Sequence, residues 1–271
     1  MKCFYINLDS AAERRISIKR SFEQNKKENW SLTRIPAFDG AYVSNNRIAG
    51  SLRPSEKACF LSHREAVRRS LEHDGPSFIL EDDSVFGKKT CEFIDRIVSD
   101  TGNLEWDIIY TDVGIPNIPD MAELLRLKHQ LGADEIRILD LKRLPFFAAS
   151  AYILNAKSKN KLYALLSSEA HFELPYDLYL RKLVFDSTVK ALVTFPFLTS
   201  VSELADASGN QESHTKETDL VWNLYRRMVW IDGNARKLKR PLRELEDRLS
   251  DEAKACGILW ATMADKKFVR K

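Results

Sequence analysis

The chain has 271 residues, a length that allows either one large domain or a domain with an appendage. Its hydrophobic and charged fractions, 44% and 30%, are ordinary for a soluble globular protein. Four cysteines lie far apart, with no Cys-x-x-Cys pair, which argues against a structural zinc site and against a disulfide framework.

The charge is unevenly distributed along the chain. The formal net charge is +3, but residues 221–271 alone hold thirteen Lys and Arg against seven Asp and Glu. This basic tail has no recognisable nucleic-acid-binding motif, which argues against nucleic acid as the main ligand. No apolar stretch has the length of a signal peptide or a membrane span. We therefore expect a cytoplasmic protein, either soluble or attached to the inner face of the membrane.

The first elements along the chain predict a βαβ unit. Residues 2–8 have the apolar, aromatic and β-branched composition of a buried strand, and residues 11–25 have helical spacing with many charges. A second strand is expected at 32–37, closed by the turn at 38–40. Strand, helix and strand at this spacing predict a parallel sheet covered by helices.

The alternation of strands and helices continues to about residue 200. In chain order the sequence predicts a helix at 54–71, a strand at 77–80, a helix around 93–98, a strand at 106–110, a loop at 112–119, a strand at 146–154, helices at 158–168 and from 174, a strand at 188–196, and a polar loop at 203–218. A basic helical segment follows. We therefore expect an α/β domain at 1–218 and a helical C-terminal extension at 219–271.

Three consecutive carboxylates, Glu81, Asp82 and Asp83, directly follow the apolar strand at 77–80. Like charges this close make each carboxylate harder to ionise, unless a cation lies among them. Mg²⁺ and Mn²⁺ take oxygen ligands, and open α/β sheets bind their ligands at the carboxyl ends of the strands. The alternative is a charged turn after a strand.

Five segments resemble glycosyltransferase family 25, the group that includes bacterial lipooligosaccharide galactosyltransferases. They are, in the family's order and at about its spacing, YINLD at 5–9 with ERR at 13–15, AFDG at 37–40, SEKACFLSH at 55–63, ILEDD at 79–83 and PYD at 175–177. The resemblance covers about residues 1–215. It implies a GT-A-like, mostly parallel sheet flanked by helices, and an inverting, metal-assisted transfer of a sugar from a nucleotide-sugar donor.

The resemblance also implies a metal site for Mn²⁺ or Mg²⁺. Asp83 is the expected metal ligand, because it lies farthest along the motif from the strand. Glu81 and Asp82 would bind the ribose hydroxyls or reach the metal through water. His214, the late histidine in the polar loop, is the expected second ligand, since neutral imidazole binds Mn²⁺; the alternative is an exposed loop histidine.

Further donor-binding residues are expected at the first strand and its neighbours. Asn7, Asp9 and Arg14 lie where the first strand meets its helix, and Arg14 would contact uracil or, alternatively, pair with a nearby acid. Asp39 would contact the nucleoside or simply end a turn. His63, next to Ser62, would contact the donor phosphate or sugar; its alternative is a structural role.

An inverting transfer needs a base that takes the proton from the acceptor hydroxyl. Asp177 is the expected catalytic base, with Glu173 and Asp112 in reserve. The alternative for Asp177 is an N-terminal helix acid that the helix dipole favours.

The partners expected from the resemblance are a UDP-sugar donor, most often UDP-galactose in this family, and a glycan or glycolipid acceptor such as lipooligosaccharide. The enzyme would then be a β-galactosyltransferase of lipopolysaccharide biosynthesis. The basic clusters at 225–230 and 236–241 could lie on an anionic membrane surface, or the extension could pack on the body with its charges in water.

Two other classes of function are possible for the same sequence. A non-catalytic protein that binds a sugar nucleotide or a glycan is one, but it would have no need to keep three clustered charges. A metal-dependent phosphohydrolase or nucleotidyltransferase is the other. The lack of a glycine-rich phosphate loop and of a second carboxylate cluster argues against it.

Overall fold

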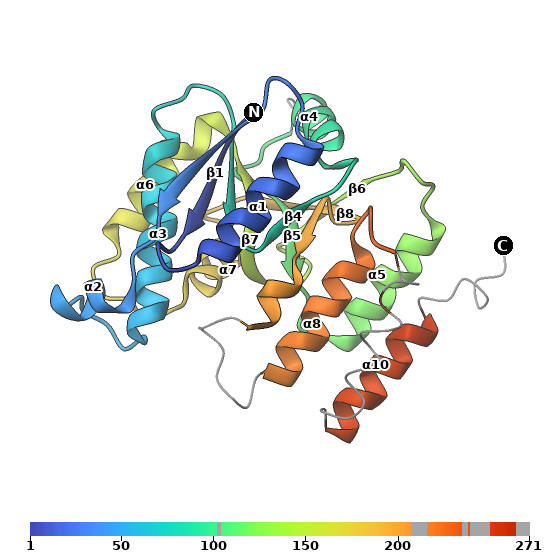
Figure 1. The fold of residues 1–271 in the computed structure, drawn as a ribbon. Coiled ribbons are helices and arrows are strands. Elements are labelled where there is room, and N and C mark those ends of the chain that lie inside the picture. The colour runs from blue at the N-terminus through green and yellow to red at the C-terminus, as the bar shows by residue number, and fades with distance from the viewer. Residues whose placement is uncertain (102–103, 208–215, 235–237, 239–249, 264–271) are drawn as a thin grey trace.

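The computed structural model describes residues 1–101, 104–207, 216–234, 238 and 250–263. A seven-stranded sheet forms its centre (Figure 1). The strands of this sheet are β1 (Lys2–Asn7), β2 (Ser31–Pro36), β3 (Ser77–Glu81), β5 (Ile108–Gly114), β6 (Arg137–Asp140), β7 (Phe147–Leu154) and β8 (Ala191–Phe195). Two short strands, β4 (Ser84–Phe86) and β9 (Thr199–Val201), pair antiparallel in a separate sheet.

The strand order in the main sheet is β2-β1-β3-β7-β5-β8-β6. Strands β2, β1, β3, β5 and β8 point the same way, whereas β7 and β6 run antiparallel to their neighbours. The predicted α/β class is confirmed, and five strands of common direction make the sheet mostly parallel. The resemblance implies a mostly parallel sheet of this kind, and the parallel pairing brings the carboxyl ends of β1 and β3 to one edge.

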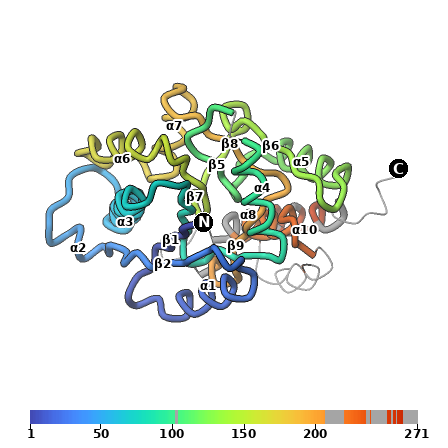
Figure 2. Tube along the Cα trace, turned by 90° about the horizontal axis from the view of Figure 1, so that it is seen from above, coloured from blue at the N-terminus to red at the C-terminus, as the bar shows by residue number. Residues whose placement is uncertain are grey.

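Helices cover both faces of the sheet, as the view from above shows (Figure 2). The helices are α1 (Ala12–Asn25), α2 (Gly40–Asn45), α3 (Pro54–Ser70), α4 (Thr90–Asp100), α5 (Ile118–Gln130), α6 (Lys159–Ser168), α7 (Tyr176–Phe185), α8 (Lys216–Val229) and α10 (Asp251–Met263). Because side chains alternate along a strand, β1 sends Phe4 and Ile6 to the face with α3, α6 and α7, and Cys3 and Tyr5 to the face with α1 and α4.

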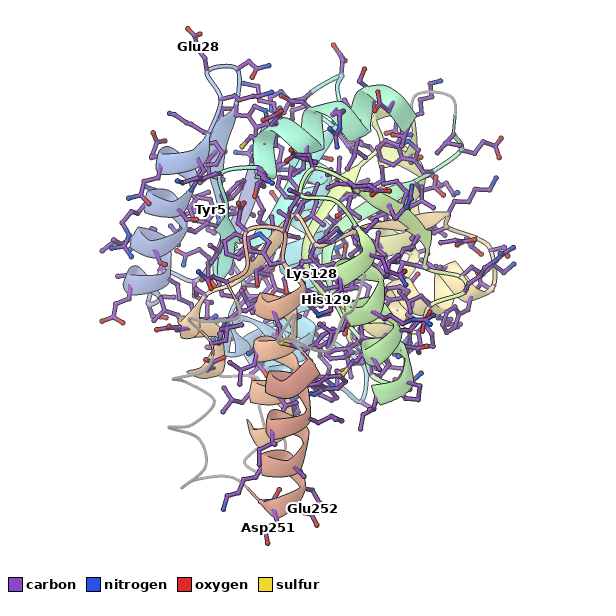
Figure 3. All side chains as sticks on the ribbon, turned by 90° about the vertical axis from the view of Figure 1, so that its right-hand side faces the viewer. Tyr5, Glu28, Lys128, His129, Asp251 and Glu252 are labelled. Carbon is purple, nitrogen blue, oxygen red and sulfur yellow. The ribbon has the colours of Figure 1, made fainter. Side chains whose placement is uncertain are left out.

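The described part of the C-terminal extension lies mostly in the helices α8 and α10, and α8 packs on the body. Tyr225, Met228 and Val229 of α8 are buried in the larger core cluster. Lys128 of α5 donates from Nζ to the carbonyl of Met228, which holds the end of α8 in place (Figure 3). The predicted boundary between residues 218 and 219 lies inside α8, and the division into two domains stays a prediction. No helix among the described residues has both the length and the apolar character needed to cross a bilayer.

Two of the predicted loops are wrong in part. The loop at 112–119 is mostly regular structure, because β5 continues to Gly114 and α5 begins at Ile118. The loop at 203–218 contains the 3₁₀ helix η3 (Glu203–Ala207), and α8 begins at Lys216. In the first case Gly114, Pro116 and Pro119 suggested a loop, but Gly114 is the last residue of β5 and Pro119 lies in the first turn of α5, where proline is tolerated. The elements α2, β4, β6, β9 and α5 were not predicted.

The membrane-facing alternative for residues 225–230 is also wrong. Arg226 is 5% exposed, and Arg227 donates to the carboxylate of Asp206 and to two backbone carbonyls. Both arginines therefore bind groups of the protein itself and do not face solvent, because the side of α8 that holds them packs against the body. The second basic cluster, 236–241, lies outside the described residues except for Leu238.

Candidate active site

The carboxylate triplet lies where β1 and β3 end side by side. The two strands are parallel, with Ile6 opposite Glu81, so that Asn7 comes next to the residues that follow β3. The chain turns at Asp82 and Asp83 and continues into β4. As a result the three carboxylates, although consecutive, lie in three different surroundings.

Both carboxylate oxygens of Asp82 accept hydrogen bonds from residues of the first βα unit. Its Oδ2 accepts a hydrogen bond of 2.7 Å from Asn7 Nδ2, and its Oδ1 accepts one of 3.2 Å from Arg14 Nη1. Asn7 is itself held by Arg34, whose Nε donates to Asn7 Oδ1. Burial raises the pKa of Asp82, although these two donors oppose the shift. The structure thus brings Asn7, Arg14 and Asp82 together, whereas the predicted contact of each with a donor stays a prediction.

Asp83 is buried but incompletely paired. Its side chain has an Oδ2 at 3.9 Å from Arg14 Nη1, while its Oδ1 has no hydrogen-bond partner within the described part of the chain. Burial, and then the neighbouring charge of Glu81, raise the pKa of Asp83 to about 7. A buried carboxylate oxygen without a partner is costly, and such a group calls for an explanation such as an ion.

Glu81 faces the other side, toward α3. Its Oε1 lies 3.2 Å from His63 Nε2, and His63 Nδ1 lies 3.1 Å from the hydroxyl of Tyr152. The Tyr152 hydroxyl in turn contacts that of Tyr176 at 2.7 Å, and the ring of Tyr176 stacks on His63. Burial alone would raise the pKa of Glu81, but the hydrogen bond and charge of His63, with two nearby arginines, hold it below its usual value.

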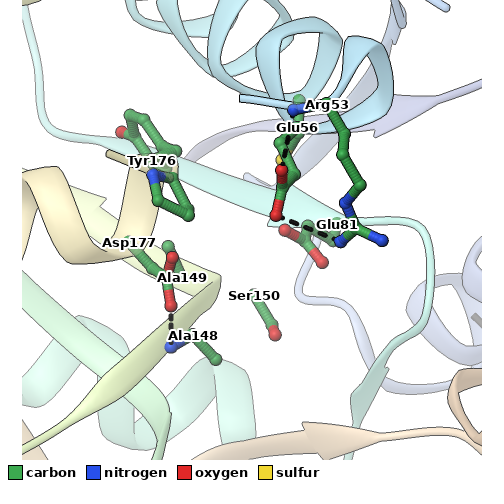
Figure 4. Close-up of a pocket in the computed structure, with 10 residues that line it drawn as sticks. Arg53, Glu56, Glu81, Ala148, Ala149, Ser150, Tyr176 and Asp177 are labelled. Atoms are coloured by element: carbon green, nitrogen blue, oxygen red, sulfur yellow. Dashed lines mark hydrogen bonds and ion pairs between the residues drawn. The ribbon is translucent and has the colours of Figure 1, made fainter. Parts of the chain in front are cut away.

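A cavity of about 260 Å³ opens beside Glu81 (Figure 4). Its walls come from α3, the end of β3, the start of β7 and the start of α7. The lining residues are Arg53, Glu56, Cys59, Glu81, Ala148, Ala149, Ser150, Pro175, Tyr176 and Asp177. Carboxylates from three separate elements therefore face one space, which suits a polar ligand with several hydroxyl groups.

Asp177 lies in the first turn of α7 and in the wall of this cavity. Its Oδ2 accepts a hydrogen bond of 2.8 Å from the backbone N–H of Ala148 (Figure 4). Ala148 has a positive φ of 64°, which is unusual for a residue other than glycine. Burial raises the pKa of Asp177 against the opposing hydrogen bond from Ala148. A carboxylate with a raised pKa in a cavity is a stronger base than an ordinary aspartate, which suits it to accept a proton from a ligand.

An ion pair that sequence reasoning missed connects α8 with the site. Arg226 binds both carboxylate oxygens of Asp112 through Nε and Nη2, and its Nη2 also donates to Ser150 Oγ at 2.8 Å. The Arg226 charge also acts on Glu81 and Asp83. The sequence did contain a signal for this pair: Asp112 is the one charged residue in the segment 108–113, IIYTDV, and an acid in a buried strand requires a partner. Because Arg226 occupies both oxygens of Asp112, this carboxylate is not free to take a proton from an acceptor, which argues against its reserve role as a base.

The remaining predicted residues lie in simpler settings. Asp9 is exposed and pairs with Arg34, and Asp39 caps α2 by accepting from the Tyr42 N–H at 2.7 Å. Ser62 Oγ accepts from the Phe38 N–H, which ties the segment before α2 to α3. Glu173 accepts from Ser51 at the surface. His214 lies outside the described residues, so its predicted role as a metal ligand, like the donor-binding roles of Asp9 and Asp39, stays a prediction.

The donors around Asp83 fit a hard divalent cation. They are carboxylate oxygens, and one of them, Asp83 Oδ1, is buried with no partner among the residues that the structure describes. Mg²⁺ and Mn²⁺ prefer oxygen ligands of this kind and use few protein carboxylates. The residues present therefore fit the metal that the resemblance implies.

Comparison with known proteins gives a family and distant structural similarities. The sequence model of glycosyltransferase family 25 (LPS biosynthesis protein) matches residues 1–180. None of the curated proteins matches the chain. Among solved structures, apo-form glycosyltransferase GlyE of Streptococcus pneumoniae TIGR4 is similar at 10% identity and a TM-score of 0.37, over 70% of this chain and 44% of that one.

Two further solved structures are similar at the same level. The galactosyltransferase LgtC, in complex with donor and acceptor sugar analogs, has 12% identity and a TM-score of 0.36, over 68% of this chain and 70% of that one. Mouse xyloside xylosyltransferase 1, in its apo form, has 11% identity and a TM-score of 0.38, over 70% of this chain and 77% of that one. Scores this low carry no argument about function, and the present chain spans less than half of the GlyE chain.

Proposed function

The chain belongs to glycosyltransferase family 25, and from this premise we propose that it is an inverting, Mn²⁺-dependent β-galactosyltransferase. The family membership supports glycosyl transfer and a place in lipopolysaccharide biosynthesis. The further proposal is that the donor is UDP-galactose and that the acceptor is a glycan such as lipooligosaccharide.

The observation that carries the proposal is the unpaired, buried Oδ1 of Asp83 at the end of β3. We assign the metal to Asp83, with His214 as a second ligand and Glu81 or Asp82 as outer contacts. When bound, the metal would offset the negative charge on the diphosphate leaving group. Mn²⁺ is preferred in this proposal, with Mg²⁺ as the alternative.

The side chains beside Asp83 would position the donor. Arg14 donates to Asp82 and to the carbonyl of Leu204, so it is held rigidly at the edge of the site. A guanidinium fixed in this way presents its plane and its remaining N–H groups to a nucleotide. His63 and its two tyrosine partners hold Glu81 at the cavity wall, where a carboxylate can accept hydrogen bonds from sugar hydroxyls.

The proposed base is Asp177, which lines the cavity on the side opposite α3. The Ala148 N–H holds one oxygen of its carboxylate, which fixes the orientation of the group. The carboxylate would take the proton from the acceptor hydroxyl as that oxygen attacks the anomeric carbon, and the configuration at that carbon would invert. The cavity would then hold the acceptor sugar.

Attachment to a membrane surface stays a prediction, and so does a cytoplasmic location. Arg226 and Arg227 pair inside the protein, and the other basic residues of the tail clusters, at 236–240, lie outside the described residues.

The test is a transfer assay with Mn²⁺, a panel of UDP-sugars and a truncated lipooligosaccharide acceptor, with products identified by mass spectrometry. We expect turnover with UDP-galactose that stops when the metal is removed with a chelator. NMR of the product should show a β linkage, because an α-linked donor is inverted. No turnover with any UDP-sugar, together with no effect of Mn²⁺ on the melting temperature, would exclude the proposed function.

A further inference from the structure

The segment SEKACFLSH contains a cysteine that the proposed transfer does not use. Cys59 lies four residues before His63 on α3, so the two side chains share one face of the helix. Cys59 lines the cavity, as does Glu81, whose carboxylate already contacts His63. The ligand atoms of Cys59, His63 and Glu81 all lie within 4.8 Å of one another.

We propose that Cys59 Sγ, His63 Nε2 and the Glu81 carboxylate form a binding site for a thiophilic divalent cation, with zinc as the ion that fits. Bond lengths of about 2.0–2.3 Å to zinc place tetrahedral ligand atoms roughly 3.3–3.6 Å apart. The 3.2 Å between His63 Nε2 and Glu81 Oε1 is already close to this spacing. The ligand atoms of all three residues already lie within 4.8 Å of one another, and the Glu81 side chain is partly exposed, so it has room to adjust.

The residues behind His63 support this assignment. A histidine that binds zinc usually donates its other ring N–H to a fixed acceptor, which sets the tautomer. Here His63 Nδ1 lies 3.1 Å from the Tyr152 hydroxyl, which contacts the Tyr176 hydroxyl at 2.7 Å. Hydroxyl groups both donate and accept, so this chain can reverse its direction. His63 can therefore give its Nε2 lone pair to zinc while Nδ1–H donates to Tyr152.

Ligand chemistry separates this site from the site at Asp83. Thiolate and imidazole favour zinc, whereas carboxylate oxygens favour Mn²⁺ and Mg²⁺. On binding, the Cys59 S–H bond is replaced by a sulfur–zinc bond and the proton passes to the buffer; no electrons are transferred. Three protein ligands leave the fourth position of a tetrahedral ion open toward the cavity.

Zinc in this site would have a consequence for transfer. It would hold Glu81 against α3 and occupy part of the cavity that Asp177 lines, so zinc should inhibit the reaction. This consequence rests on the proposed function, but zinc binding itself does not. A binding measurement therefore separates a failure of the zinc site from a failure of the transferase proposal.

The test measures zinc on the purified full-length chain. After dialysis against zinc in the presence of excess Mn²⁺, we expect one tightly bound zinc per chain by atomic emission. Cys59→Ser should weaken zinc binding at least about tenfold, since even the loss of an outer partner costs this much. The matched control is Cys91→Ala, which removes a buried thiol from the opposite face of the sheet and should leave zinc binding unchanged.

Cobalt provides a second measurement that needs no variant. Co²⁺ bound to a thiolate gives a near-ultraviolet charge-transfer band, which we expect in the wild-type protein and which excess zinc should remove. Zinc binding of equal strength in wild type and Cys59→Ser, or cobalt binding without the thiolate band, would overturn the proposal. Cys59→Ala serves as the replacement if Cys59→Ser does not fold.

Discussion

The structure holds two kinds of carboxylate in and around the candidate site. Asp82 and Asp112 are closed, which means that both carboxylate oxygens have partners: Asn7 and Arg14 donate to Asp82, and Arg226 donates to both oxygens of Asp112. Asp83 and Asp177 are open: Asp83 has an oxygen without a partner among the described residues, and Asp177 faces the cavity. Asp82, Asp83 and Asp112 are all buried and Asp177 is half-buried, so burial alone does not identify the residues that act on a ligand.

The closed and open carboxylates differ in what compensates the free-energy cost of removing their charge from water. The closed carboxylates are compensated inside the protein, so they should contribute to stability and little to chemistry. The open ones leave part of this cost uncompensated until a ligand arrives, as functional groups often do. Substitution of a closed carboxylate should therefore mainly lower stability, whereas substitution of an open one should mainly lower activity.

The largest effect is expected for Asp83→Asn. Transfer should fall by roughly 10³-fold or more, because the metal contributes several kcal/mol to the stabilisation of the leaving group. Mn²⁺ should no longer raise the melting temperature, whereas the metal-free variant should be at least as stable as the wild type, since an unpaired buried charge is removed. Steady-state kinetics and thermal unfolding with and without Mn²⁺ measure both effects. Transfer at the wild-type rate would refute the metal assignment.

Asp177→Asn is expected to lower kcat by about 10²–10⁴-fold, the usual contribution of a general base. The KM for the donor should change little, because the cavity side of Asp177 belongs to the acceptor in this proposal. The amide retains an oxygen that can accept from the Ala148 N–H, so the fold should persist. A variant with full kcat would point to Glu56 or Glu81 as the base.

The wild-type pH profile tests the same residue. A base must be deprotonated to act, and burial raises the pKa of Asp177. The loss of kcat/KM toward acid should therefore occur above the usual range of an aspartate, and activity should rise with pH through this range. An acid limb that lies at the ordinary aspartate value, or that is unchanged in Asp177→Asn, would contradict the assignment.

The closed pair Asp112–Arg226 should respond in stability. Arg226→Met leaves the Asp112 charge buried without its partner, which should cost about 3–5 kcal/mol of the free energy of unfolding. The double variant Arg226→Met, Asp112→Leu removes both charges and should recover most of this loss. Urea unfolding measures the three proteins. A double variant as unstable as the single one would show that Arg226 acts through packing instead.

Much of the fold could be predicted from the sequence, because its signals are local. The apolar run before Glu81 and the helical spacing from Pro54 are patterns of neighbouring residues, and both elements are observed. The sequence also placed Asn7 and Asp82 near the carboxyl ends of two strands, and because parallel strands end at the same edge of a sheet the two side chains meet in the structure.

The rest of the site depends on contacts between distant segments. Arg226 lies 114 residues from Asp112, and its basic neighbours in the sequence suggested a surface cluster. The N–H that binds Asp177 comes from Ala148, whose positive φ no pattern of side chains encodes. The hydroxyl chain behind His63 joins α3, β7 and α7. A single sequence does not show which distant segments contact each other, so the partner of each of these carboxylates could not be assigned.

The smallest effect is expected for Asp82→Asn. This variant tests whether Asp82 contributes to stability alone or also to binding of the donor. The amide cannot accept at both positions as the carboxylate does, so the hydrogen bonds from Asn7 and Arg14 weaken, at a cost of about 1–3 kcal/mol in the free energy of unfolding. Asp9→Asn is the matched control, because Asp9 also pairs with an arginine but is exposed to water, which screens the pair, so this substitution should change stability little. If Asp82→Asn lowers stability but leaves the KM for the donor within a few-fold of wild type, Asp82 holds Arg14 in place and contacts no nucleotide. If instead the KM for the donor rises sharply at unchanged stability, Asp82 acts on the donor. Its assignment to the closed carboxylates, which rests on its hydrogen bonds with Asn7 and Arg14, would then be wrong.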